Sequence, residues 1–466
     1  MSPLTFYIPL DDDLREIRVL TLMPGGYDYP LHGVLSHVSL HSNPHYEPLS
    51  YVWGDPRDVI PMNISTTQDE TAFSVNVTLN LAAALRTLRY PDKGRDLWVD
   101  ALCINQNDND EKSYQVRLML EIYKTPSVLI WLGAVPWDFQ PFPGYENMVI
   151  SSTWKQQNPK RFHGKFPEPE VWSKSVRGRV GPPSDLIKEA FKFVEDIAGL
   201  EHLHDWPCFE SPQPLDLIKE AFKFVEDIAG LEHLHDWPGF ERSWSSRETQ
   251  LKDRYQSILL ALNWIMDLPY WNRVWTIQER LLPETGIVMY GPFTTQLRTL
   301  EKIARTAFNV TAMPDCCQKA KCDIRPAHWA LIEAAFMPLK LLFEAGDLVK
   351  DEPVLCLENQ LRAHRYAQAT DPRDKIYAFL GLTGQPSLFE VDYRLDVGEV
   401  YRRFAVKCLE EKRNLKGLIN SEGGSSPLGL PSWVPVRHEP RTHSSKRFLG
   451  TNISPHCRIG VDKISI

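Results

Sequence analysis

The sequence has few cysteines, no block of like charges and no long apolar run, and each shortage excludes a class of protein. The eight cysteines are sparse in 466 residues, and the cluster at Cys316, Cys317, Cys322 and His328 lacks the paired spacing of a structural zinc site. Acids and bases are interspersed at a net charge of −8, which gives nucleic acid no positive field to bind. The longest apolar stretch, SILLALNWIMDL, is too short to span a membrane, and the N-terminus lacks a basic leader before an apolar segment. These absences predict a cytoplasmic protein without a membrane span, bound metal or nucleic acid partner.

A glycine-rich phosphate loop is also missing. The turns PGG (24–26) and EGGSSP (422–427) are not followed by the Lys-Ser/Thr pair that a phosphate loop needs. What is abundant is apolar surface, because 43% of the residues are hydrophobic and 14 are tryptophan. A chain of this length and composition predicts a folded protein of two or three domains.

Strand-like and helix-like segments alternate over the first third of the chain. The strand segments are apolar on both faces, as the interior strands of a parallel sheet between helices are. The pattern therefore predicts an α/β fold with a parallel sheet flanked by helices. The expected strands lie at 17–22, 48–55, 97–100, 127–133 and 286–291, and the expected helices at 80–90, 111–124, 247–267 and 371–382.

Polar side chains gather where the expected strands end. Asp55, Asp100, Asn105 and Gln106 all lie at or just past a strand end, and parallel sheets bind ligands at that edge. Capping of neighbouring amides by the two acids, and a turn built by Asn105 and Gln106, explain the same positions without a ligand.

The expected organisation divides the chain into five parts. A helical insertion interrupts the α/β domain, and a mainly helical region and a disordered tail follow it. The parts are 1–134 (first part of the domain), 135–245 (insertion), 246–300 (remainder of the domain), 301–440 (helical C-terminal region) and 441–466 (tail).

The insertion contains a tandem duplication. Residues 185–210 recur as residues 216–241 and differ only at Cys208 and Gly239. Each copy is expected to be an amphipathic helix that ends at a glycine. Near-identity indicates a recent duplication or an error in the gene model, and two units are too few for a solenoid. No functional site is expected there.

Several long strings resemble the fungal heterokaryon incompatibility (HET) domain family. They are YEPLSYVWGD (46–55), the segment from LWVDALCINQ to VLIWLG (97–133), YWNRVWTIQE (270–279), DPRDKIYAFLGL (371–382) and LPSWVPV (430–436). The resemblance implies a role in non-self recognition between hyphae and in programmed cell death. The chain ends sooner after LPSWVPV than the resemblance leads us to expect.

The chain is also distantly similar to TIR signalling domains, which have a flavodoxin-like parallel sheet. LSYVWGD resembles the first TIR strand, and the Trp-x-x-x-Glu from Trp275 to Glu279 resembles the TIR helix whose glutamate cleaves NAD. The resemblance implies a candidate NAD glycohydrolase with NAD as substrate, no other cofactor, and self-association or a partner signalling protein. The implied site has Glu279 as the catalytic residue, with nucleotide-binding residues Tyr51, Trp53, Gly54, Asp55, Asp100, Asn105, Gln106, Arg273 and Trp275.

Loss of nicotinamide from NAD needs little more than one well-placed carboxylate. Positive charge builds on the ribose while a neutral base departs, and a carboxylate against an apolar aromatic wall stabilises that charge. Glu279 lies one helical turn after Trp275 and meets this need. The structural alternatives are a surface glutamate paired with Arg273 or Arg280, and buried tryptophans at Trp53 and Trp98.

The residues also allow two other functions. Cys103 with a distant histidine, His32 or His45, would make a thiol hydrolase, but the local excess of acids disfavours a thiolate. The second alternative is a non-catalytic module that triggers death by assembling with partners.

Overall fold

The structure is a computed structural model. The residues that it describes contain one large sheet. They are residues 6–67, 72–135, 214–231, 253–308, 367–383 and 389–412, with single residues between 233 and 237 and between 332 and 364. Within these parts the sheet has the order β5-β4-β2-β1-β6-β3-β7-β8-β9. Its strands are β1 (Glu16–Leu22), β2 (His32–Ser39), β3 (Glu47–Tyr51), β4 (Val59–Thr66), β5 (Phe73–Thr78), β6 (Arg95–Trp98), β7 (Ser127–Trp131), β8 (Thr285–Tyr290) and β9 (Phe293–Gln296).

The centre of the sheet is parallel and its flanks are mixed. Strands β6, β3, β7 and β8 are parallel neighbours, with Tyr51 of β3 level with Trp131 and Met289. On one side β1 is antiparallel to β6 and to β2, and on the other β9 is antiparallel to β8. The α/β class is thus confirmed, but an all-parallel sheet was wrong, because β1, β5 and β9 run against their neighbours.

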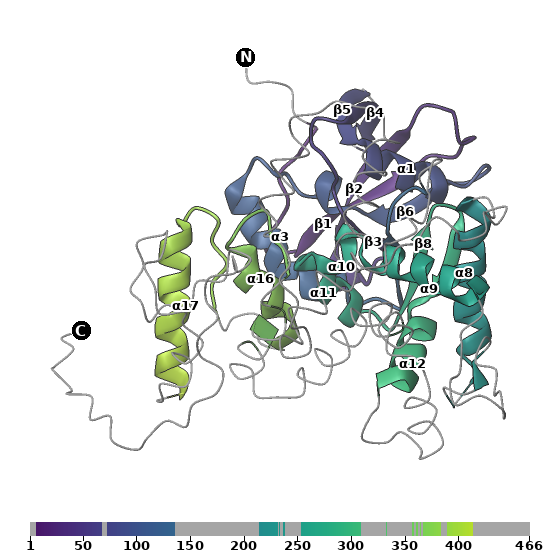
Figure 1. The fold of residues 1–466 in the computed structure, drawn as a ribbon. Helices are drawn as coiled ribbons and strands as arrows, with labels where there is room; N and C mark the ends of the chain where they lie inside the picture. Colours follow the sequence, from purple (N-terminus) through teal and green to yellow (C-terminus); the bar gives the residue numbers. More distant parts are fainter. Residues whose placement is uncertain are drawn as a thin grey trace, which may run out of the picture.

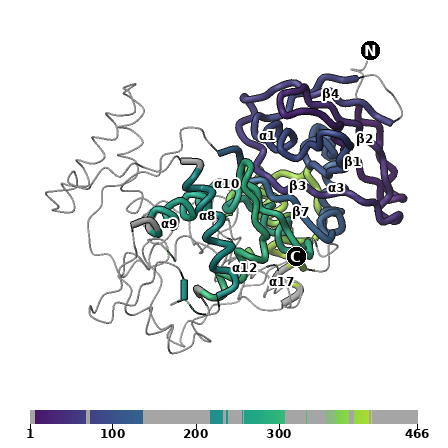
Figure 2. The backbone as a smooth tube through the Cα atoms, turned by 90° about the vertical axis from the view of Figure 1, so that its right-hand side faces the viewer, coloured from purple at the N-terminus to yellow at the C-terminus, as the bar shows by residue number. Residues whose placement is uncertain are grey.

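Helices lie near the centre of this sheet and at its β9 end. Figure 1 shows α16 beside α11, which packs on β3, and Figure 2 shows α8, α9 and α12 together at the end away from β1, β2 and α1. The α-helices are α1 (Leu79–Leu88), α2 (Asp100–Cys103), α3 (Asn109–Ile122), α8 (Pro214–Ile228), α9 (Asp253–Met266), α10 (Pro269–Asn272), α11 (Trp275–Leu281), α12 (Leu297–Phe308), α16 (Asp374–Leu380) and α17 (Val397–Lys412). The 3-10 helices are η1 (Leu40–Ser42) and η5 (Gly381–Thr383).

Side-chain caps fix where the helices beside the central strands begin. The Thr78 hydroxyl accepts the Leu81 amide at the start of α1, and the Asp108 carboxylate accepts the amides of Asp110 and Glu111 at the start of α3. The polar run at residues 107–110 thus contains the cap of α3.

The second copy of the duplicated segment contains helix α8. Its expected apolar face is confirmed, since Ile218, Ala221 and Val225 are almost fully buried. Helix α8 packs on α9, α12 and β9, with the rings of Phe222 and Phe293 at 5.9 Å. The first copy, the expected tail at 441–466 and most of the region 301–440 lie outside the described residues.

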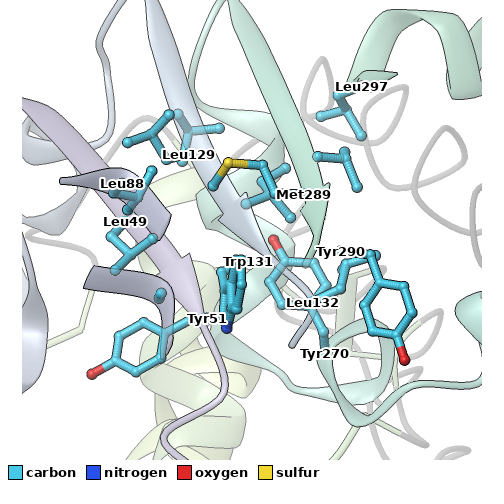
Figure 3. Close-up of a cluster of buried hydrophobic side chains, with 14 of the residues drawn as sticks. Leu49, Tyr51, Leu88, Leu129, Trp131, Leu132, Tyr270, Met289, Tyr290 and Leu297 are labelled. Atoms are coloured by element: carbon cyan, nitrogen blue, oxygen red, sulfur yellow. The ribbon is translucent and has the colours of Figure 1, made fainter. Parts of the chain in front are cut away.

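Two apolar clusters meet at helix α11. The larger one surrounds the sheet, and Figure 3 shows part of it, with Tyr51 and Trp131 at the ends of β3 and β7. The smaller one is formed by residues of α16, α17 and their connections, and it includes Val274 and Ile277. Trp275 packs against both clusters, so α11 is held from two sides. Among the described residues, no helix is long and apolar enough to cross a membrane.

Candidate functional site

The order of the parallel strands marks one position in the sheet. Along the sheet, the four central parallel strands β6, β3, β7 and β8 are the second, first, third and fourth of these four in the chain. The next central strand in the chain, β6, lies on one side of β3. The one after it, β7, lies on the other side of β3. Ligands of open α/β sheets bind at the carboxyl ends of the strands at such a reversal. The end of β3 is therefore the place to look for a site.

A buried carboxyl group lies at this strand. The Ser50 hydroxyl of β3 donates to Oε2 of Glu279 at 2.5 Å, and the Tyr270 hydroxyl lies 2.8 Å from the Ser50 oxygen. Because Ser50 gives its proton to the carboxylate, Tyr270 must donate to Ser50. Glu279 is 5% exposed, so the structure contradicts the alternative of a surface glutamate.

A half-buried rim of three side chains lies next to Glu279. The Trp53 indole donates to the Asp100 carboxylate at 2.8 Å, and the Arg273 guanidinium lies over the Trp53 ring at 5.5 Å. Arg273 also donates to the Tyr51 carbonyl oxygen at 3.3 Å. The residues come from the end of β3, from α2 and from the turn before α11. The fold thus unites four of the predicted site residues, Trp53, Asp100, Arg273 and Glu279, around the Tyr51 backbone.

Burial dominates the electrostatics of this site. It raises the pKa of Glu279 to about 7, and the neighbouring Asp100 carboxyl raises this pKa as well. The bond from Ser50 and the positive charges of Arg273 and Arg280 act in the opposite direction. Burial likewise raises the pKa of Asp100, against the lowering effect of Arg273 and Trp53. A carboxyl group that changes charge near neutral pH is typical of an acid-base or charge-stabilising site.

Arg280 contributes charge without a direct ion pair to Glu279. Its guanidinium is buried, lies 5.5 Å from the ring centre of Tyr270 and 5.2 Å from that of Trp271, and donates to the Thr276 carbonyl. Arg280 follows Glu279 on α11 and contacts the same Tyr270 that binds Ser50. Its charge favours the ionised form of Glu279.

The remaining predicted residues lie in the turns around the site. Asp55 forms an exposed ion pair with Arg57, and Gly54 turns the chain at a φ of +87°, a conformation that favours glycine. The Asn105 side chain accepts the Asn107 amide, and the Gln106 side chain donates to the Asp100 carbonyl. These contacts agree with the structural alternatives of capping and turn formation for Asp55, Asn105 and Gln106.

Two tryptophans face away from the expected ligand position. Trp275 packs against both apolar clusters and lowers the pKa of the Asp374 carboxyl of α16, so the aromatic neighbour of the site is Trp53 instead. Trp98 is fully buried and packs edge-on against Tyr123 at 5.6 Å, as the alternative of a core tryptophan predicts.

The thiol hydrolase alternative finds no support in the surroundings of Cys103. This side chain is fully buried, and burial raises the pKa of its thiol to about 12. His32 approaches Ser65 at 3.4 Å. In the described part of the chain, no group of three His, Cys, Asp or Glu residues could hold a metal ion.

Sequence reasoning missed three residues that shape the site. Ser50 and Tyr270 lie 220 positions apart, and nothing local links them. A serine inside an otherwise apolar strand was the available signal for Ser50. Asn80 of α1 ties the strand ends together, since it donates to the Val52 carbonyl at 2.6 Å and accepts the Trp131 indole at 3.0 Å.

Comparisons with known proteins agree on one family. Residues 46–178 match the family described as heterokaryon incompatibility protein (HET). A curated relative, heterokaryon incompatibility protein 6, OR allele, from Neurospora crassa, is 38% identical over 135 residues. This similarity covers 27% of the chain and 20% of the relative, so the chain spans about a fifth of the relative's length. No solved structure matches.

Proposed function

Because residues 46–178 place this chain in the heterokaryon incompatibility family, we propose that it acts in fungal non-self recognition and in the programmed cell death that follows. The printed name of the curated relative supports the first part of this proposal. A cytoplasmic location and a partner signalling protein remain predictions of the sequence.

We further propose that the site cleaves NAD to nicotinamide and ADP-ribose. Water adds at the anomeric carbon of the ribose, the bond to nicotinamide breaks, and one proton is released. The Glu279 carboxylate stabilises the positive charge that develops on the ribose, and its burial strengthens that interaction. The observation that best supports this proposal is the buried Glu279, which accepts from Ser50 on β3, the strand at which the strand order reverses.

The half-buried rim supplies the groups that a nucleotide needs. Trp53 offers an aromatic face for a base, and Arg273 offers a positive charge for a phosphate. Asp100 has lone pairs left for ribose hydroxyls, although its Oδ2 already accepts from Trp53 and its Oδ1 from the Ala101 amide. The strand order β6-β3-β7-β8 agrees with the flavodoxin-like order, which supports the TIR-like part of the proposal.

The direct experiment is to mix the purified protein with NAD and to follow the release of nicotinamide. Release above a blank is expected, and it should be lost when the protein is unfolded. Absence of release at every protein concentration would favour the other function, a non-catalytic module that signals by assembly.

The pH dependence of NAD cleavage is expected to follow Glu279. Only the ionised carboxylate stabilises a cation, so kcat/KM should rise about tenfold per pH unit below pH 7 and level off above about pH 8. The half-maximal value should lie near pH 7, because the pKa of Glu279 is raised to about 7. A profile that is already flat at pH 5 would assign the reaction to another group.

Self-association is expected from the TIR resemblance, where contacts between copies complete the site. The specific rate of NAD cleavage should then rise as the protein concentration rises, together with the mass measured by light scattering. A constant specific rate over a hundredfold dilution would show that one chain suffices.

A further inference from the structure

We propose that Asp374 is a positioning residue that holds α11, and with it Glu279, in place from the C-terminal side. The family match ends at residue 178, yet Glu279 and the segment around Asp374 both lie beyond it. The unit that holds Glu279 then reaches beyond that match, at least to Tyr393. This inference rests on the proposed function only for its activity measurement.

A buried carboxyl group joins α11 to α16. Asp374 is 8% exposed, and its Oδ1 accepts the Tyr393 hydroxyl at 2.6 Å. The Trp275 indole at the first turn of α11 lies near enough to this carboxyl group to lower its pKa, and α11 packs on α16. Burial of such a carboxyl group is tolerated only when donors satisfy it, so Asp374 constrains the position of Tyr393 and of the α16 turn that packs on α11.

A backbone bridge fixes the chain just before α11. The Val274 amide donates to the Gln368 carbonyl at 2.9 Å, and the Gln368 amide donates to the Asn272 carbonyl at 2.6 Å. Arg273 lies between these two bonds and reaches the site with its side chain. Gln368 thereby fixes the backbone on both sides of Arg273. Helix α16, which follows Gln368 in the chain and contains Asp374, packs on α11.

Tyr393 extends the same chain of contacts to α3. Its amide donates to the Ser113 hydroxyl at 3.0 Å, and the Lys112 ammonium lies 4.2 Å from the centre of its ring. Helix α3 follows α2, which carries Asp100, so Tyr393 links α16 to the helix next to that acid. A shift of this segment would move α11 relative to β3 and lengthen the bond between Glu279 and Ser50.

The test compares two variants with a matched control by hydrogen exchange and by NAD cleavage. Asp374→Asn removes the charge and one acceptor oxygen of the buried carboxyl group, and Tyr393→Phe removes only the hydroxyl that donates to it. Glu399→Gln is the control, because Glu399 pairs with Arg402 and Arg403 on α17 and has no described bond to α11. In both test variants we expect amides of residues 270–282 to exchange about tenfold faster, with β1 unchanged.

The activity measurement separates positioning from general damage. In both variants kcat for nicotinamide release should fall about tenfold with KM little changed, and the pH of half-maximal rate should move below 7 as water reaches Glu279. Exchange at 270–282 equal to that of Glu399→Gln in both variants would overturn the inference. If the unaltered protein releases no nicotinamide, the proposed function fails while the exchange data still decide whether Asp374 holds α11.

Discussion

Replacing Glu279 by glutamine is expected to lower the rate of nicotinamide release about a thousandfold and to stabilise the folded protein above pH 7. Glutamine has the size of glutamate and can still accept the Ser50 hydroxyl, but it has no charge to stabilise the ribose cation. The rate loss therefore reports the charge, and the retained contact keeps the helix in place.

The gain in stability follows from the raised pKa of Glu279. Between its ordinary value of 4.5 and about 7, the folded protein binds a proton that the unfolded chain has released, so stability falls as pH rises through this window. At 1.36 kcal/mol per pKa unit, the total loss is about 3 kcal/mol. The glutamine variant should lack this part of the pH dependence.

Urea unfolding at pH 5 and pH 8 measures this difference. The unaltered protein should lose more stability than Glu279→Gln between the two pH values. Glu284→Gln is the matched control, since this exposed carboxylate lies three residues beyond α11 and should behave like the unaltered protein. A pH response shared by all three proteins would mean that Glu279 titrates as an ordinary surface acid.

The second large effect is expected at Glu111, which neutralises a buried arginine. The Arg18 guanidinium is 1% exposed and donates to both oxygens of Glu111, at 2.6 and 3.0 Å. The Asn105 amide donates to the same carboxylate at 2.6 Å. Glu111→Ala leaves a buried charge without its partner, and this should cost about 3–5 kcal/mol of the free energy of unfolding.

Glu121→Ala is the matched control for this substitution. Glu121 lies on the same helix and pairs with Arg15, but both side chains are more than a third exposed, at 34% and 42%. Loss of such a surface pair should cost at most about 1 kcal/mol. Urea unfolding at pH 7 compares the two, and equal losses would mean that the Arg18 pair does not hold β1 against α3.

The central strands could be predicted because each one is an apolar run in the local sequence. Apolar runs such as SVLIW are buried on both faces and bounded by turn residues, and β7 follows that run. Strands β2 and β4 were missed for the opposite reason. HGVLSHVS contains two histidines and two serines, and VIPMNIST contains a proline, so neither has the composition of an interior strand.

The carboxyl group of the site could be found from sequence, but its surroundings could not. The spacing of Trp275 and Glu279 suggested one shared face, yet the short helix α11 lies between two apolar clusters, and Trp275 turns to the one that contains α16. Ser50 reaches Glu279 only through the packing of α11 on β3, and Tyr270 of α10 contacts the same Ser50. Contacts over more than 200 residues are properties of the fold and leave no local pattern.

The proposed chemistry depends most directly on the titration of the Glu279 carboxyl group. Carbon-13 NMR of the glutamate carboxyl groups, with Glu279→Gln to assign the signal, gives the pKa of Glu279 without any assumption about the substrate. We predict a value of about 7. A value at or below 4.5 would show that the group is hydrated and freely charged, and would contradict the buried carboxyl on which the proposed chemistry is built.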